Sequence, residues 1–157
     1  MASTSPQFLL REAPGGAGRD GALDLLADAG WPRSLLTVWA SSGTVLELYD
    51  PADDEPLGAA IVNAAKGGTY ELRAWAATVD TREPAVSRRL VTAIADALRR
   101  SGGRRVVASV GDADPERLAS LLDAGFRVLS VERDAPLASG GRPGDPSRDL
   151  VWMDQDL

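Results

Sequence analysis

The segment from Tyr70 to Phe126 constrains the fold most, because its hydrophobic pattern changes period along its length. Tyr70–Val79 reads as a strand, and from Pro84 onward the apolar residues recur at helical spacing. A short Val-rich run over 105–110 is typical of a buried parallel strand, and a second helical pattern begins after Asp114. Strand, helix, strand and helix in this order predict a mixed α/β fold.

Both helices of this segment have boundary signals in the sequence. The first begins near Pro84 and ends before Gly102-Gly103. Asp114 is a typical N-cap of the second, with Pro115 at the first helical position and Gly125 at the C-terminal end. Three leucines of this second helix are expected to face the core: Leu118, Leu121 and Leu122.

The residues before this segment predict a strand, a helix and a meander. Gln7–Glu12 reads as a first strand, and the apolar positions from Leu23 to Leu26 indicate a short helix ending near Gly30. Leu35–Ala40 fits a helix or a strand. Thr44–Tyr49 and Leu57–Ala65 alternate and are joined by turn residues, so with the strand at 70–79 they predict an antiparallel meander.

The C-terminal part of the chain predicts two further strands, at Phe126–Arg133 and Asp149–Met153. Between them, Ala135–Ser147 is rich in Gly and Pro and is expected to be a mobile loop. We expect residues 1–157 to form one domain, since a chain of this length buries enough surface for a sizeable core.

Composition excludes several classes of site and partner. The chain contains neither Cys nor His, which removes disulfides, zinc–thiolate clusters and the usual general base. Its formal charge of −6 argues against a nucleic-acid partner. No apolar run is long enough to span a bilayer, and the N-terminus lacks a secretory pattern. We therefore expect a cytoplasmic protein with no metal, nucleic acid or membrane partner.

A glycine fingerprint at Gly16–Gly21 matches GxGxxG and follows a predicted strand, which raises a dinucleotide-binding fold as an alternative. That fold also needs an acidic residue about 20 residues later to hold the ribose. The corresponding region, Ala40–Gly43, has none. A flexible connection explains the glycines equally well, and a nucleotide-binding oxidoreductase is the weakest of the functions considered.

The turn from Arg82 to Ser87 has the spacing of a phosphate-binding motif. It reads Arg82-Glu83-Pro84-Ala85-Val86-Ser87 and opens the first helix of the segment, where backbone N–H groups and the helix dipole favour an anion. It resembles the Arg/Gln-x-x-Gly-x-Gly/Ala motif of the GCN5-related N-acetyltransferases, with Ala85 and Ser87 at the two small-residue positions and Glu83 at the first spacer. An ordinary strand-to-helix connection is the alternative.

The second helix carries a further resemblance to the same family. Members typically show Asn, two spacers and Ala, then Leu-Tyr and a closing Gly-Phe pair. This chain has Asp114 at the Asn position, Leu121 at the Tyr position and Gly125-Phe126 at the end. In the family that Tyr often protonates the departing thiolate, which Leu121 cannot do. A thiol with a pKa of about 8.5 is still a tolerable leaving group without a positioned acid.

The resemblance implies a seven-stranded, mostly antiparallel sheet flanked by helices, whose central strand separates from its neighbour. It also implies acetyl-CoA as co-substrate, an amine of a small molecule or peptide as acceptor, and direct attack in a ternary complex. A homodimer is one possible state. The implied cofactor-binding residues are Ala77, Val79, Arg82, Glu83, Ala85, Val86, Ser87 and Arg88. Seven of the sixteen arginines lie between Arg82 and Arg105, which indicates either a positive patch near the cofactor or a solvated helix face.

Glu71 is the candidate general base, because many family members place a catalytic or water-linked Glu on this strand. An amine with a pKa of about 10.4 is neutral in about one molecule in 2,500 at pH 7, so a base or a desolvating site must assist. Tyr70 and Tyr49 are further candidates for the same cleft, and an exposed structural carboxylate is the alternative for Glu71. The alternative function is a non-catalytic binding or assembly module with a degenerate CoA site.

Overall fold

The computed structural model describes residues 8–52, 54–78, 84–135 and 148–157. Within them, seven strands form one sheet in the order β1-β2-β3-β4-β5-β7-β6. Neighbouring strands are antiparallel except β4 and β5, which are parallel. The strands are β1 Leu9–Glu12, β2 Thr44–Asp50, β3 Glu55–Ala64, β4 Thr69–Ala77, β5 Arg105–Gly111, β6 Arg127–Glu132 and β7 Leu150–Asp156. The helices are α1 Ala17–Asp28, α2 Arg33–Ser42, α3 Pro84–Arg100 and α4 Pro115–Asp123, with a short 3-10 turn at Lys66–Gly68.

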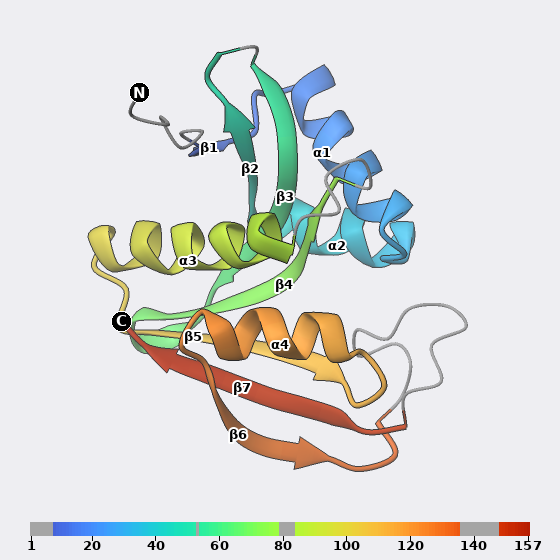
Figure 1. Cartoon of the computed structure of the whole chain (residues 1–157), viewed down its shortest axis with the longest axis vertical. Coiled ribbons are helices and arrows are strands. Elements are labelled where there is room, and N and C mark those ends of the chain that lie inside the picture. Colours follow the sequence, from blue (N-terminus) through green and yellow to red (C-terminus); the bar gives the residue numbers. More distant parts are fainter. Residues whose placement is uncertain (1–7, 53, 79–83, 136–147) are drawn as a thin grey trace, which may run out of the picture.

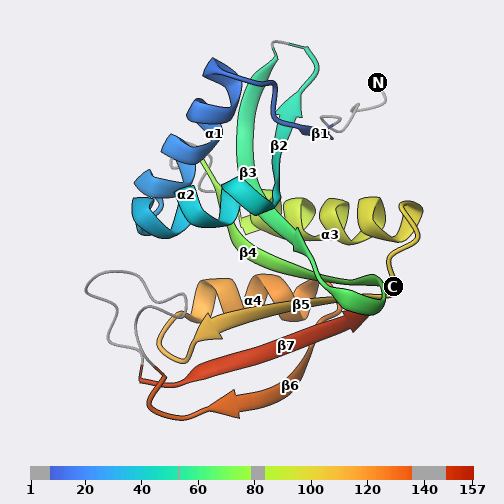
Figure 2. The same cartoon turned by 180° about the vertical axis from the view of Figure 1, so that it is seen from behind.

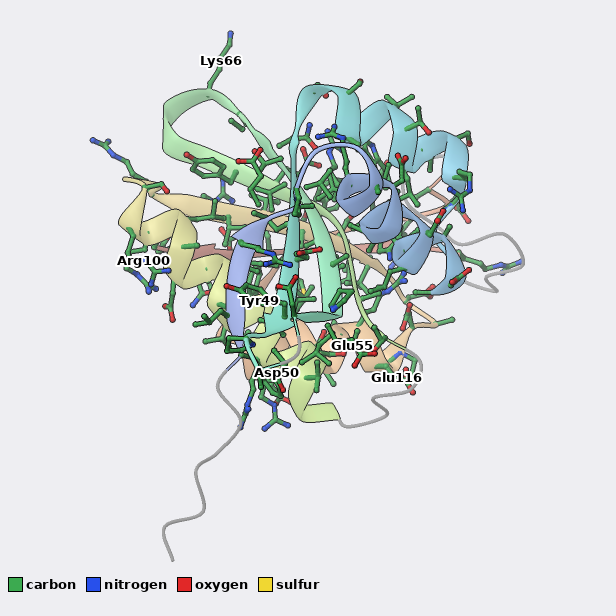
Figure 3. All side chains as sticks on the ribbon, turned by 90° about the horizontal axis from the view of Figure 1, so that it is seen from above. Tyr49, Asp50, Glu55, Lys66, Arg100 and Glu116 are labelled. Atoms are coloured by element: carbon green, nitrogen blue, oxygen red, sulfur yellow. The ribbon has the colours of Figure 1, made fainter. Side chains whose placement is uncertain are left out.

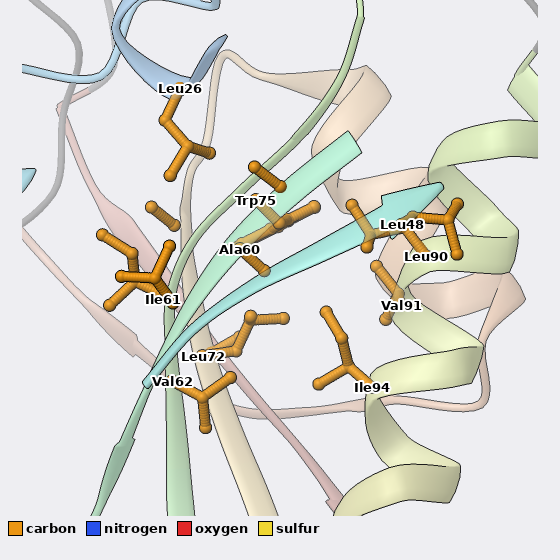
Figure 4. Close-up of a cluster of buried hydrophobic side chains, with 14 of the residues drawn as sticks. Leu26, Leu48, Ala60, Ile61, Val62, Leu72, Trp75, Leu90, Val91 and Ile94 are labelled. Atoms are coloured by element: carbon orange, nitrogen blue, oxygen red, sulfur yellow. The ribbon is translucent and has the colours of Figure 1, made fainter. Parts of the chain in front are cut away.

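The sheet lies between two helical layers. α3 and α4 cover one face (Figure 1), and α1 and α2 cover the N-terminal half of the other face (Figure 2). On the α3 side, Leu90, Val91 and Ile94 pack toward Leu48 and Leu72 of the sheet (Figure 4). All five are buried, which is the expected result of a helical apolar stripe facing alternate strand positions.

The predicted boundaries of α4 are confirmed, and one predicted core residue is wrong. The carboxylate of Asp114 accepts the N–H of Arg117 at 3.3 Å as an N-cap, and Gly125 ends the helix with a φ of +97°. Leu121 is fully buried, but Leu122 is 48% exposed. The buried residues of α4 are Ser120 and Leu121, and because successive helical positions differ by about 100°, Leu122 lies on the exposed side of this face.

Two ambiguities of the N-terminal region are resolved. Leu35–Ala40 lies in the helix α2, whose buried residues Leu36 and Ala40 are spaced four apart. The Gly16 fingerprint caps and opens α1. The strand before it, β1, is antiparallel to β2, whereas the dinucleotide-binding unit requires parallel strands, so that alternative is wrong.

A buried carboxylate ties together three strands of the C-terminal half. Asp154 on β7 accepts hydrogen bonds from Arg105 on β5 at 2.8 Å and from Arg127 on β6 at 3.3 Å. Burial opposes ionisation and by itself raises the pKa of Asp154. The two guanidinium groups outweigh burial, so its pKa lies below the ordinary value of 3.8.

Candidate active site

The central feature of the site is a separation between β4 and β5. The two strands pair only from Thr69 with Arg105 to Leu72 with Ala108. β4 then continues to Ala77 along β3, and β5 continues to Gly111 along β7. Residues 73–77 and 109–111 therefore face each other without a ladder, and Figure 1 shows β4 turning away from β5. We call this gap the strand opening; the resemblance had predicted it.

A β-bulge accompanies the start of the strand opening. Ala74 pairs with Ile61 and Leu72 with Val62, so Arg73 is an extra residue on β4. A bulge bends a strand and increases its twist, which explains why β4 leaves β5 at this point. The bulge therefore places Arg73, and Glu71 two residues before it, at the apex of the strand opening, which is the point where the β4–β5 ladder ends.

The open edge of β4 carries backbone amide groups that β5 does not use. The N–H of Thr78 bonds to the carbonyl of Leu57 at 2.9 Å. Because alternate residues of a strand direct their amides to opposite edges, those of Trp75 and Ala77 face the strand opening. The indole Nε1 of Trp31 donates to the carbonyl of Trp75 at 3.2 Å. Ala77, a predicted cofactor contact, thus lies on the open edge.

Glu71 lies on the α1 and α2 side of the sheet. Leu72 faces α3, so the preceding residue Glu71 faces the opposite layer. Arg73 is the extra residue of the bulge, and its contact with Trp39 places it in the same layer. The Glu71 side chain is 24% exposed and pairs with Nη1 of Arg73 at 2.8 Å. The Arg73 guanidinium lies 5.9 Å from the ring centroid of Trp39 on α2. Glu71 is therefore a half-buried, ion-paired carboxylate at the apex of the strand opening.

The two tyrosines predicted to share this cleft lie elsewhere. Tyr49, labelled in Figure 3, is on β2, which β3 separates from β4. The guanidinium carbon of Arg11 lies 3.9 Å from the centroid of the Tyr49 ring. Tyr70 pairs with the core residue Val106 and so lies on the face opposite Glu71. The expectation is wrong for both residues.

The predicted phosphate turn is described only in part. Val79, Arg82 and Glu83 lie outside the described residues. α3 begins at Pro84, so Ala85, Val86 and Ser87 provide the first-turn N–H groups. The Val86 side chain is buried in the core, which leaves its backbone as the part able to contact a ligand.

Arg88, another predicted cofactor contact, is engaged with α4. Its Nη2 lies 3.1 Å from Oδ2 of Asp123, and both side chains are about half exposed. This ion pair links the two helices that flank the strand opening. The structure therefore assigns Arg88 a contact between helices, which the sequence did not predict.

Arg117 of α4 reaches across the strand opening. Its guanidinium carbon lies 3.9 Å from the ring centroid of Trp31 and 5.9 Å from that of Trp75. The side chain is 12% exposed, and its Nη1 is 3.6 Å from Oδ2 of Asp114. Because α4 follows β5 and Trp75 belongs to β4, this cation spans the two sides of the gap.

Solved structures identify the architecture. An IAA acetyltransferase from Bacillus cereus superposes with a TM-score of 0.78 at 15% identity, covering 96% of this chain and 100% of that one. A Bacillus subtilis acetyltransferase in complex with CoA gives 0.79 at 18%, covering 96% and 99%. A GNAT family acetyltransferase from Elizabethkingia anophelis with acetyl-CoA bound gives 0.80 at 15%, covering 96% and 98%. The chain has the fold of the GCN5-related N-acetyltransferases. No family model and no curated protein matches the sequence.

Within this N-acetyltransferase fold, α4 departs from the family pattern at two positions. Leu121, at the position of the usual Tyr, is fully buried and has no proton to donate. Arg117 stands three residues after Asp114, where the pattern has Ala. Sequence reasoning overlooked Arg117, although a long cation at a position normally held by a small residue was a signal.

The arginines of this cluster that the structure describes do not form one patch beside the strand opening. Arg88 lies near the start of α3, whereas Arg99 and Arg100 lie in its last turn. α3 has 17 residues and is about 25 Å long. In Figure 3, Arg100 at the end of α3 lies far from Glu116, which is in the first turn of α4. The described arginines therefore divide between the two ends of the helix.

The described residues contain no group of three or more acidic, His or Cys side chains suited to a metal ion. Among the same residues, no helix has the length and apolar character needed to cross a membrane.

Proposed function

We propose that the protein is an acyl-CoA-dependent N-acetyltransferase, which transfers an acetyl group to an amine of a small molecule or peptide. The observation that carries the proposal is the strand opening, where the edge of β4 beyond Leu72 has no ladder to β5. α3 begins at Pro84, seven residues after β4 ends at Ala77. An extended amide-containing chain such as pantetheine can pair with such an edge. The N-terminus of α3 favours an anion such as a pyrophosphate.

Three backbone amides fit acetyl-CoA, those of Ala77, Ala85 and Ser87. The amide of Ala77 faces the strand opening, as described above. Ala85 and Ser87 are small residues in the first turn of α3, so a phosphate can approach their N–H groups closely. Acetyl-CoA would supply the acyl group as a thioester, and the amine would displace the thiolate, with a C–N bond forming and the C–S bond breaking.

Glu71 is the proposed proton acceptor for the attacking amine. Its carboxylate lies at the apex of the strand opening on the α1 and α2 side, and the pairing with Arg73 at 2.8 Å restricts its orientation. An acceptor entering from that side would meet Glu71 next to the bulge. A positioned base of this kind contributes about 10²–10⁴ in rate.

Arg117 is the proposed stabiliser of the departing thiolate. A fixed cation in a site with little water stabilises negative charge that develops in the transition state. The Arg117–Asp114 pair presents its positive end to the tryptophans beside the open edge of β4. This charge would act where Leu121 offers no hydroxyl group.

Acetyl-CoA binding tests the proposal. At a ligand concentration of 100 times Kd, binding stabilises a protein by about 2.7 kcal/mol, which raises the Tm of a chain of this size by about 5–10 °C. NAD serves as the control ligand. Turnover is then followed by thiol release with a panel of amines; the absence of Cys means that the protein itself gives no thiol signal.

A second candidate is a non-catalytic member of the fold, which the burial of Leu121 and the Arg117–tryptophan contacts within the strand opening favour. This candidate predicts no Tm shift with millimolar acetyl-CoA and no thiol release with any amine.

A further inference from the structure

Among the residues that the structure describes, β6 is the last strand of the sheet, and every one of its six residues is exposed. Three of them are large and apolar: Val128, Leu129 and Val131 expose 55%, 50% and 53% of their surface. An unpaired edge presents a row of N–H and C=O groups that another strand can bond. The opposite edge strand, β1, has only four residues, and its Arg11 is ion-paired with Glu47 and Asp54.

A β-bulge changes which residues of β6 share a face. Val128 pairs with Met153 and Ser130 with Trp152, so Leu129 is an extra residue. Residues three apart in a regular strand point to opposite faces. The bulge instead places Val128 and Val131 on the same face, because their partners on β7 are two residues apart.

The same register places the two charged residues of β6 together on the other face. Arg127 pairs with Asp154 and Glu132 with Leu150, and these partners are an even number of residues apart. Arg127 also bonds Asp156 at 3.2 Å, and Glu132 accepts the indole N–H of Trp152 at 3.0 Å. A bulge usually hinders edge pairing. Here it gives β6 two faces with a symmetric pattern, apolar on one and oppositely charged at the two ends of the other.

We propose that two copies of the chain associate through their β6 edges, antiparallel about a two-fold axis between Leu129 and Ser130. Val128 then lies opposite Val131 of the partner subunit, and Arg127 lies opposite Glu132 of the partner subunit. The two-fold axis generates each of these two cross-strand pairs a second time. Cross-strand apolar and opposite-charge pairs of this kind stabilise a sheet, whereas like charges placed opposite each other destabilise it.

Sedimentation equilibrium tests the association. The wild-type protein is expected to reach twice the 16.5 kDa of one chain as its concentration rises. Val128→Lys combined with Val131→Lys places like charges opposite each other and is expected to give monomers. Val128→Glu combined with Val131→Lys places opposite charges there and is expected to restore the dimer. Both positions are more than half exposed, so circular dichroism should show folded variants.

Val38→Lys is the matched control, because Val38 is 61% exposed on α2 and lies away from β6. It is expected to remain dimeric. A wild-type protein that stays monomeric at the highest concentration overturns the proposal. So does a double-lysine variant that still forms dimers, since another surface must then hold the copies together.

Disulfide trapping tests the register, and the absence of native Cys makes the readout clean. Val128→Cys with Val131→Cys is expected to form covalent dimers under mild oxidation, because directly opposite Cβ atoms are about 4.5–5.5 Å apart. Val128→Cys alone leaves the two thiols about 10 Å apart along the strand and is expected to stay uncrosslinked. Equal crosslinking of the single variant, or none of the double variant in a dimeric protein, would refute the register.

Discussion

Replacing Ala77 by proline tests the open edge of β4 most sharply. Because the N–H of Thr78 bonds to Leu57, the N–H of Ala76 faces β3 and that of Ala77 faces the strand opening. Ala77→Pro therefore removes an amide that the sheet does not use. One hydrogen bond contributes about 0.5–1.5 kcal/mol, so the Kd for acetyl-CoA should rise about 2- to 12-fold. The Tm should change little, since proline is tolerated where the N–H points out of a sheet.

Isothermal titration calorimetry with acetyl-CoA measures the loss, and Ala76→Pro is the control. That substitution removes a ladder hydrogen bond to β3, so it should lower the Tm markedly. Equal Tm losses in the two variants would show that the alternation inferred from Thr78 is wrong. If Ala77→Pro is folded and binds acetyl-CoA as tightly as the wild-type protein, the open edge has no role in binding.

Three further substitutions probe the proposed chemistry and the fold. Glu71→Gln should lower kcat by about 10²–10⁴ with little change in the KM for acetyl-CoA; an unchanged kcat removes Glu71 from the mechanism. Arg117→Gln removes the charge proposed to stabilise the thiolate. At an effective dielectric of about 20, two unit charges about 5 Å apart interact by about 3 kcal/mol, and Asp114 would offset part of this. We expect kcat to fall about 10- to 100-fold and to depend more steeply on the pKa of the leaving thiol. Arg11→Gln is the control, because it removes another guanidinium that lies 3.9 Å from an aromatic ring. It should leave the dependence of kcat on the thiol pKa unchanged. Asp154 has a lowered pKa, so its charge stabilises the fold above the ordinary pKa of 3.8, and this contribution is lost as the pH falls through the folded value. In urea denaturation, Asp154→Asn should be clearly less stable than the wild-type protein at pH 7, and the difference should shrink below pH 4; a constant difference would contradict the assignment.

The sequence predicted most of the fold because its elements carry local signals. Asp114, Pro115 and Gly125 mark the ends of α4 through capping physics that needs only neighbouring residues. Leu35–Ala40 was ambiguous because a short apolar run fits both the helical and the strand period. Its packing against the sheet decides for the helix. Leu122 was misplaced because the i, i+3, i+4 spacing of Leu118, Leu121 and Leu122 fits one helical face, whereas the face that α4 buries includes Ser120 and Leu121 and leaves Leu122 outside it.

The site was harder to predict because it depends on contacts between distant segments. The end of the β4–β5 ladder and the bulge at Arg73 define the strand opening, and neither was read from a local sequence pattern. The contact between Arg117 and Trp31 joins residues 86 positions apart in the chain, so no local pattern reveals it. Tyr49 was offered as a further candidate for the cleft, whereas the strand order places it on β2, beyond β3.

The most direct test of the acyl-CoA transferase proposal is an NMR titration of the uniformly 15N-labelled protein with acetyl-CoA. The account predicts that the largest amide shifts occur at Ala77 and at Ala85 and Ser87 in the first turn of α3, with smaller shifts at the Trp31 indole. Signals from β6 should move little. An unchanged spectrum at millimolar acetyl-CoA, or shifts confined to residues away from the strand opening, would contradict it.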